Sequence, residues 1–208
     1  PEETKLVNAR IANEDDDVML VTDSGRAIRF STTAVRVFKG RKSTGVRGIK
    51  LHGDDKVVSM SIIRHFEASP DERSAYLKMR RAVAGMSDDE VSSQEEEEEE
   101  INVNATISPE KYAEMSAAEN LILTITSSGS GKLSSSHDYP VRGRGGMGVS
   151  AIDKKMRGGL LVASFPVEIE DQIMLATSNG QSIRVPVEGI SFRSRSAGGV
   201  KVFNTGED

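Results

Sequence analysis

An arginine recurs at the same place in three similar stretches of the chain, residues 40–46, 143–149 and 194–200. Each stretch reads small residue, Arg, three variable residues, Gly and Val. Duplex DNA presents a continuous line of phosphates, so cations repeated on successive structural units can follow its backbone. The pattern therefore favours a nucleic-acid surface built from repeated loops. The repeated arginines are Arg41, Arg144 and Arg195.

Other basic residues lie near the repeated arginine, and residues 36–50 contain no Asp or Glu. We predict that these cations bind the phosphates of double-stranded DNA without reading its base sequence, since no groove-reading helix accompanies them. The alternative is a solvated loop rim whose arginines are incidental. The predicted DNA-binding residues are Arg29, Arg36, Lys39, Arg41, Lys42, Arg47, Lys50, Lys132, Arg142, Arg144, Arg184, Arg193, Arg195 and Lys201.

The acidic residues are distributed unevenly along the chain. In total, 32 acidic and 27 basic residues give a net charge of −5, but residues 67–119 alone hold 15 acidic and 5 basic residues. The remainder has 17 acidic and 22 basic residues, a balance of +5. A DNA partner is therefore compatible with the net negative charge.

Other chemistries lack the residues that they need. The chain has no Cys, and its three His stand without partners at metal-ligand spacing, so we expect no disulfide and no metal site. Residues 134–138 contain the types of a catalytic triad, but neighbours on one strand cannot converge on a substrate. No nucleotide-binding loop pattern is present. We therefore expect no catalytic residue and no cofactor in this chain.

The sequence also bears on location. No stretch approaches the roughly 18 apolar residues of a membrane helix, and no signal peptide opens the chain. The absence of Cys fits a reducing cytoplasm. We expect a cytoplasmic protein and no membrane partner, and we interpret the start at Pro1 as that of a fragment.

The repeat extends beyond the arginine. Residues 18–25, 122–129 and 173–180 each contain four mostly apolar residues, Thr, two small polar residues and Gly, which predicts a strand and a tight turn. A second strand follows each turn. Four strands per unit, at a period near 51 residues, predict an all-β fold of propeller blades with four antiparallel strands each. The third strands are predicted at 46–51, 149–153 and 200–203, and the fourth at 5–11, 56–62 and 159–165.

An acidic insert, residues 66–119, separates the first and second repeats. Residues 69–72 form a capping box with Pro at the first helical position, which predicts a helix over about 70–84. Residues 87–100 end in six Glu and have little apolar surface to bury, so we expect disorder there. A second Ser-Pro-Glu predicts a helix over about 109–118.

The chain then divides into three parts. Residues 1–65 hold the last strand of one blade and the first full repeat, and the insert follows. Residues 120–208 hold the second and third repeats of the same domain.

These motifs resemble the later blades of the C-terminal domain of the DNA gyrase A subunit. The resemblance covers residues 5–65 and 120–206, through stretches such as 17–25 and 171–175. It implies a six-bladed β-pinwheel, a propeller relative in which neighbouring blades exchange strands and a basic rim wraps DNA. The family's first-blade motif Gln-Arg-Arg-Gly-Gly-Lys-Gly is absent, and residues 142–148 come nearest to it.

The resemblance implies a DNA-wrapping module that guides DNA for ATP-dependent negative supercoiling by a parent type II topoisomerase. Its partners would be double-stranded DNA and, in the parent heterotetramer, the rest of the gyrase A subunit together with the gyrase B subunit. The topoisomerase IV counterpart is the alternative within the family. A propeller-type protein-interaction module is the alternative from another class; the net acidity favours it and the repeated arginine disfavours it.

We predict that deleting residues 87–100 tightens DNA binding at low salt, because this anionic segment competes with phosphates for the cationic rim. The gain should shrink as added salt screens the attraction. DNA affinity measured by fluorescence anisotropy at low and high salt tests this. A Gly/Ser segment of equal length is the control for chain length, and unchanged affinity at low salt would mean that the segment is only a linker.

Overall fold

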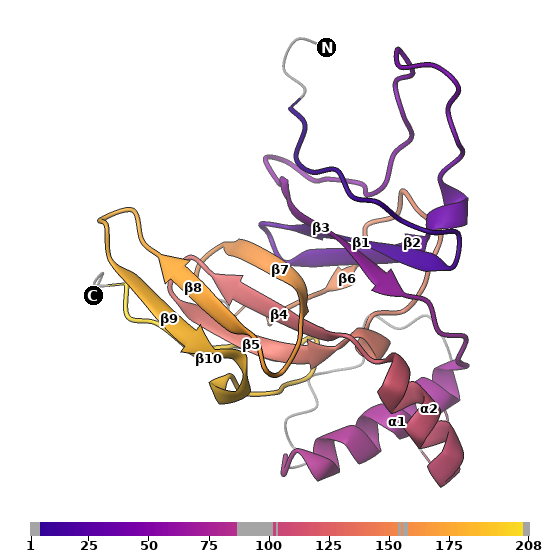
Figure 1. Ribbon diagram of the computed structural model, residues 1–208, viewed down its shortest axis with the longest axis vertical. Helices are drawn as coiled ribbons and strands as arrows, with labels where there is room; N and C mark the ends of the chain where they lie inside the picture. The colour runs from indigo at the N-terminus through magenta and orange to yellow at the C-terminus, as the bar shows by residue number, and fades with distance from the viewer. Residues whose placement is uncertain (1–4, 87–101, 103, 154, 156–157, 206–208) are drawn as a thin grey trace.

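The strands form three antiparallel sheets (Figure 1). The first sheet has the order β3-β1-β2-β6, the second has the order β10-β5-β4-β7, and the third contains β8 and β9. The strands are β1 (Asp16–Thr22), β2 (Arg26–Ser31), β3 (Val57–Arg64), β4 (Leu121–Thr126), β5 (Ser130–Ser135), β6 (Val149–Ser150), β7 (Leu161–Val167), β8 (Gln172–Ala176), β9 (Ser182–Pro186) and β10 (Val200–Lys201). This computed structural model describes residues 5–86, 102, 104–153, 155 and 158–205.

Each repeat begins with a hairpin whose turn is the predicted Thr-x-x-Gly stretch. In the first hairpin, Gly25 N donates to Thr22 O at 3.0 Å, and its φ of +88° is one that glycine adopts without strain. Gly129 and Gly180 close the β4–β5 and β8–β9 turns with equivalent bonds of 3.1 Å. A 3-10 helix follows each hairpin: η1 (Thr32–Ala34), η3 (Ser136–Asp138) and η4 (Val187–Gly189).

The third predicted strand of a repeat joins the sheet of the preceding repeat. β6, from the second repeat, pairs with Arg26 and Ala27 of β2, and β10, from the third repeat, pairs with β5. Each four-stranded sheet therefore takes its outer strand from the repeat that follows. This exchange confirms the predicted all-β fold of four-stranded pinwheel blades.

Two predicted strands, residues 5–11 and 46–51, are irregular in the structure, and those predictions were wrong. Their equivalents pair with the first and second strands of a blade: β3 with β1, and β6 with β2. For residues 5–11 and 46–51, no such partner strand exists within the described ranges. An extended segment without a partner strand cannot form the ladder of hydrogen bonds that stabilises strand geometry.

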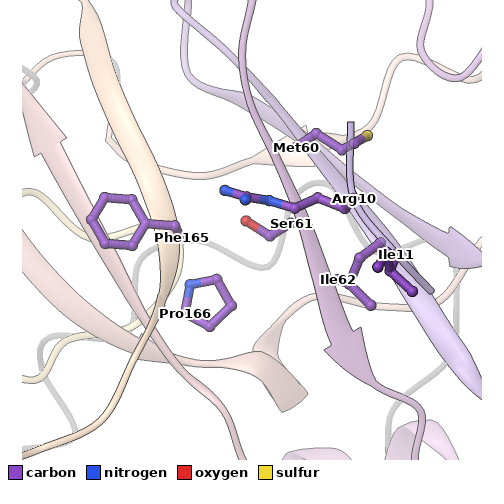
Figure 2. Close-up of a pocket in the computed structure, with 7 residues that line it drawn as sticks. All are labelled: Arg10, Ile11, Met60, Ser61, Ile62, Phe165 and Pro166. Carbon is purple, nitrogen blue, oxygen red and sulfur yellow. The ribbon is translucent and has the colours of Figure 1, made fainter. Parts of the chain in front are cut away.

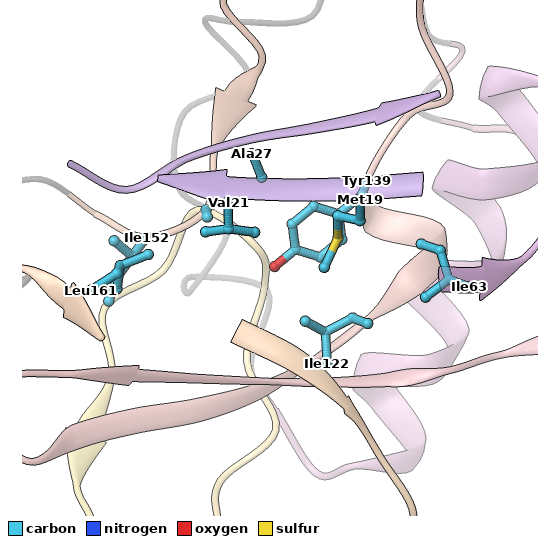
Figure 3. Packing of buried hydrophobic residues seen from close by; sticks show 9 residues of the cluster. Met19, Val21, Ala27, Ile63, Ile122, Tyr139, Ile152 and Leu161 are labelled. Atoms are coloured by element: carbon cyan, nitrogen blue, oxygen red, sulfur yellow. The ribbon is translucent and has the colours of Figure 1, made fainter. Parts of the chain in front are cut away.

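The first two blades share one hydrophobic core. Met19 and Val21 of β1 pack with Ile122 of β4 and Leu161 of β7, and all four side chains are buried (Figure 3). The innermost strands of the two blades also touch, because the Ser59 hydroxyl of β3 donates to Ser164 O of β7. Aliphatic residues at alternate strand positions thus unite the blades into one packed body.

The insert contains two helices, α1 (Pro70–Val83) and α2 (Pro109–Ala118), where the sequence predicts 70–84 and 109–118. The predicted capping box is present: Ser69 Oγ accepts from Glu72 N at 3.2 Å, and Ser69 N donates to Glu72 Oε2 at 2.8 Å. Residues 87–100, for which we predicted disorder, lie outside the described residues. Within the described part of the chain, no helix is long and apolar enough to span a membrane.

We predict that Gly148→Ala lowers the free energy of unfolding by about 2 kcal/mol or more. Gly148 has a φ of +70°, and a Cβ there would lie 2.2 Å from Ala27 O, at the point where β6 joins β2. Gly40→Ala is the matched control, because the Cβ position of Gly40 has open space around it. Urea denaturation of both variants measures the difference, and equal stability would contradict the proposed close approach.

Candidate nucleic-acid interface

The loop that follows η1 exposes a dense set of cations. It begins at Val35, the C-cap residue of η1, and ends where β3 starts at Val57. In Figure 1 this purple loop projects away from the first sheet. Within residues 36–50, its exposed cations are Arg36, Lys39, Arg41, Lys42, Arg47 and Lys50.

A second loop, residues 139–148, is hydrogen-bonded to the first. Lys50 N donates to Gly146 O at 2.8 Å, and Arg144 Nη1 donates to Arg47 O at 3.1 Å. The two loops therefore place cations of successive repeats on one surface, and no Asp or Glu occurs within 36–50 or 139–152. We call this surface the loop patch; its members are Arg36, Lys39, Arg41, Lys42, Arg47, Lys50, Arg142 and Arg144.

Three predicted cations belong to the third repeat and lie elsewhere. Arg184 is exposed on β9, Lys201 is exposed on β10, and Arg193 is half-buried. β9 and β10 lie apart from the loop that follows η1 (Figure 1). These residues are candidates for contacts on the next part of the rim and do not enlarge the loop patch.

The repeated arginine makes the same backbone contact in the second and third repeats. Arg144 Nε donates to Ala34 O at 2.9 Å. Arg195 Nε donates to Asp138 O at 2.8 Å. Ala34 and Asp138 are equivalent residues, since each ends the 3-10 helix of the preceding repeat. The recurrence of this arginine in the sequence is thus explained by contact between repeats.

Arg195 is only 6% exposed, so its assignment to DNA binding is corrected. Its Nη1 donates to Ser150 O, the position equivalent to Arg47 in the contact made by Arg144. Its main-chain N donates to Asp138 Oδ2 at 2.7 Å. A guanidinium buried to this extent does not reach a phosphate at the surface, whereas Arg144, which makes the equivalent contacts, is exposed.

Arg29 is likewise buried, at 3% exposure, and its assignment to DNA binding is corrected. Its Nε pairs with Asp17 Oδ2 at 2.8 Å, and its Nη1 donates to Ser136 O of the next blade at 2.8 Å. Burial lowers the pKa of Arg29, and the buried carboxylate of Asp17 opposes that shift. Arg29 therefore joins two blades, and its buried positive charge is balanced by the carboxylate of Asp17.

Lys132 is fully buried, and it also leaves the DNA-binding set. Its Nζ donates to the carbonyls of Ser194, Arg195 and Ala197 in the third repeat. Burial lowers the pKa of Lys132 to about 7. A signal in the sequence could have shown this role: counted from the turn glycines, Lys132 occupies the position of Ile28 and Ile183, which is apolar in the other repeats.

A cavity between the first two blades offers few groups that could take part in chemistry. The cavity, of about 260 Å³, lies between β3 and β7 and is lined by Arg10, Ile11, Met60, Ser61, Ile62, Phe165 and Pro166 (Figure 2). Its lining offers one hydroxyl and one guanidinium, with no acid or imidazole to act as a base. Among the described residues, no three His, Asp or Glu lie together as a metal site would require.

Strand-exchanged blades with a basic loop rim define a β-pinwheel domain. The family described as "DNA gyrase C-terminal domain, beta-propeller" matches residues 16–64, 120–168 and 171–208, one stretch for each repeat. The chain belongs to this family. The matched stretches leave out α1 and α2, so these helices are additions to the family's repeat.

Similar proteins are named as A subunits of DNA gyrase. That of Granulibacter bethesdensis is 43% identical over 98% of this chain and 23% of its own length. Those of Rickettsia bellii and Salmonella typhimurium are 38% and 31% identical, over 97% and 98% of this chain and 22% and 17% of their lengths. The chain therefore spans about a fifth of these curated relatives.

Two solved structures share the fold. The C-terminal domain of a DNA topoisomerase IV has a TM-score of 0.60 at 19% identity, over 92% of this chain and 43% of that one. The E. coli ParC C-terminal domain has a TM-score of 0.52 at 14% identity, over 93% and 56%. At such low identity, these likenesses support the architecture alone.

We predict that Lys132→Met lowers the free energy of unfolding by about 2 kcal/mol, because three carbonyls lose their donor, and leaves DNA affinity within twofold. Since the folded-state pKa of about 7 lies below the ordinary 10.5, the native protein releases this proton at lower pH than the unfolded chain does. The stability of the parent relative to the variant should therefore rise between about pH 7 and 10. Urea titrations across this range measure it. A constant difference would mean that the ammonium stays charged when buried.

Proposed function

We propose that this chain is a DNA-binding and DNA-wrapping part of a gyrase A subunit, and that it binds double-stranded DNA without base-sequence preference. The observation that carries the proposal is the loop patch, in which hydrogen-bonded loops of successive repeats present exposed cations with no acidic residue among them. Repetition along the rim would extend this surface over neighbouring blades.

The mechanism is electrostatic. Exposed Lys and Arg side chains neutralise phosphates, and the counterions that they release favour binding. The patch presents irregular loops, which offer phosphate contacts and no helix for the major groove. Contacts on successive blades would offset the few kcal/mol needed to bend the duplex.

We further propose that the parent protein is a cytoplasmic, ATP-dependent type II topoisomerase, in which this domain positions DNA while catalysis takes place elsewhere. Its partners would be the rest of the gyrase A subunit together with the gyrase B subunit. The identity of 31–43% to proteins named as A subunits of DNA gyrase supports gyrase over topoisomerase IV. Negative supercoiling by the full-length protein, assayed with and without this domain, distinguishes the two.

We predict that reversing three exposed lysines of the loop patch weakens DNA binding at least tenfold at physiological salt without unfolding the domain. The variant is Lys39→Glu, Lys42→Glu and Lys50→Glu. If each lysine contacts one phosphate, the slope of log affinity against log salt should decrease in magnitude by about 3. A salt titration on duplexes of unrelated sequence measures both quantities.

Lys42→Glu and Lys78→Glu form a matched pair of single reversals for this experiment. Both lysines are exposed, but Lys78 lies on α1 and outside the loop patch. Lys78→Glu should leave affinity within twofold. Equal effects of the two reversals would refute the loop patch as the binding surface, and a strong preference among random duplexes would refute sequence-independent binding.

A further inference from the structure

We propose that the α1–α2 insert is a brace that holds the first blade, the second blade and the third repeat in one relative orientation, and thereby sets the curvature of bound DNA. The bracing role follows from contacts within the chain. The consequence for DNA rests on the proposed function.

The ends of the insert are tied together at the junction of the first two blades. Arg64, the last residue of β3, donates from its main-chain N to Asn120 Oδ1 at 3.1 Å and from Nη1 to Ala117 O at 3.0 Å. Asn120 N in turn donates to Ser136 Oγ at 3.0 Å, in η3. The helical hairpin therefore starts and ends on the same joint between the blades.

His137, in η3, is the centre of the packing between the insert and the second blade. It is 3% exposed, and the ring of Tyr76 in α1 lies 5.0 Å from it at an interplanar angle of 80°. Phe66, between β3 and α1, contacts the same imidazole edge-on at 5.6 Å. His137 Nε2 donates to Met115 O in α2 at 2.7 Å. Both helices and the β3–α1 connection thus converge on one buried side chain of the second blade.

Arg80 extends the brace to the third repeat. Its guanidinium lies 4.3 Å from the centre of the Phe192 ring, and its Nε pairs with Glu119 Oε2 at 3.2 Å, which orients it. Phe192 belongs to the segment by which the third repeat crosses onto β5: Leu133 N donates to Ser191 O at 2.9 Å, and Arg193 N donates to Leu133 O at 2.7 Å. The insert therefore contacts residues 191–193, the segment through which the third repeat bonds to β5.

This arrangement links the insert to DNA geometry. Wrapping needs the cations of successive blades to hold a fixed spacing. If the joint between blades is flexible, part of the binding free energy is lost in ordering the blades. Contacts that stiffen residues 191–193 would fix this spacing while contributing no phosphate contact of their own. Loss of the brace should therefore change DNA bending more than DNA affinity.

The test compares Arg80→Met with Lys78→Met, an exposed position on the same helix, in the full-length protein. Hydrogen–deuterium exchange at the amides of Leu133 and Arg193 should be at least fivefold faster in Arg80→Met and within twofold of the parent in Lys78→Met. Phe192→Leu, which removes the ring and keeps the Arg80–Glu119 ion pair, should reproduce the effect. Unchanged exchange in both Arg80→Met and Phe192→Leu overturns the brace.

The effect on DNA is measured in two ways. Energy transfer between dyes at the two ends of a duplex long enough to wrap reports bending. The affinity for a duplex too short to bend reports binding alone. Arg80→Met should lower end-to-end transfer at saturation and leave affinity for the short duplex within twofold. Faster exchange with unchanged transfer overturns the link to DNA curvature. If the parent itself binds no DNA, the proposed function fails, and the exchange measurement still decides whether the insert is a brace.

Discussion

The exchange of backbone hydrogen bonds between successive repeats is the constraint on which the rest of this structure depends. Each of the two four-stranded sheets is completed by a strand from the following repeat, as β6 completes the sheet of β2 and β10 that of β5. Without that strand, the second strand of each hairpin would present a row of unpaired N–H and C=O groups. The exchange thus connects the pairing of strands directly to the spacing of blades.

The exchange also explains why several cations lie inside the protein. Where a segment crosses between blades, some carbonyls have no partner in a regular ladder, and a buried cation can supply the missing donors. Lys132 satisfies three such carbonyls, and Arg29 and Arg195 each bridge to a neighbouring repeat. Carbonyl and phosphate oxygens accept hydrogen bonds from the same donors. Residue type alone therefore does not distinguish a Lys or Arg that bonds to a neighbouring repeat from one that contacts DNA.

The exposed cations and the insert occupy different parts of the same joint. The loop patch arises because Arg144 and the Lys50 amide draw two loops together, so a contact between repeats also assembles the surface. The insert packs where β3 ends and β4 begins, and it adds an aromatic cluster around His137 to that junction. In the proposed brace, side chains that contact no phosphate would thereby set the geometry of the rim.

The sequence by itself determined the features that depend on neighbouring residues. The turn glycines, the order of strands within a hairpin and the capping box at Ser69 follow from local backbone preferences, and the repeat then predicted the fold class. Tertiary structure alone decided which sheet each third strand joins, and that residues 5–11 and 46–51, which have no partner strand in the described ranges, are irregular. It also decided which cations are buried. Both outcomes depend on the partner that a neighbouring repeat supplies, and spacing along one chain does not reveal that partner.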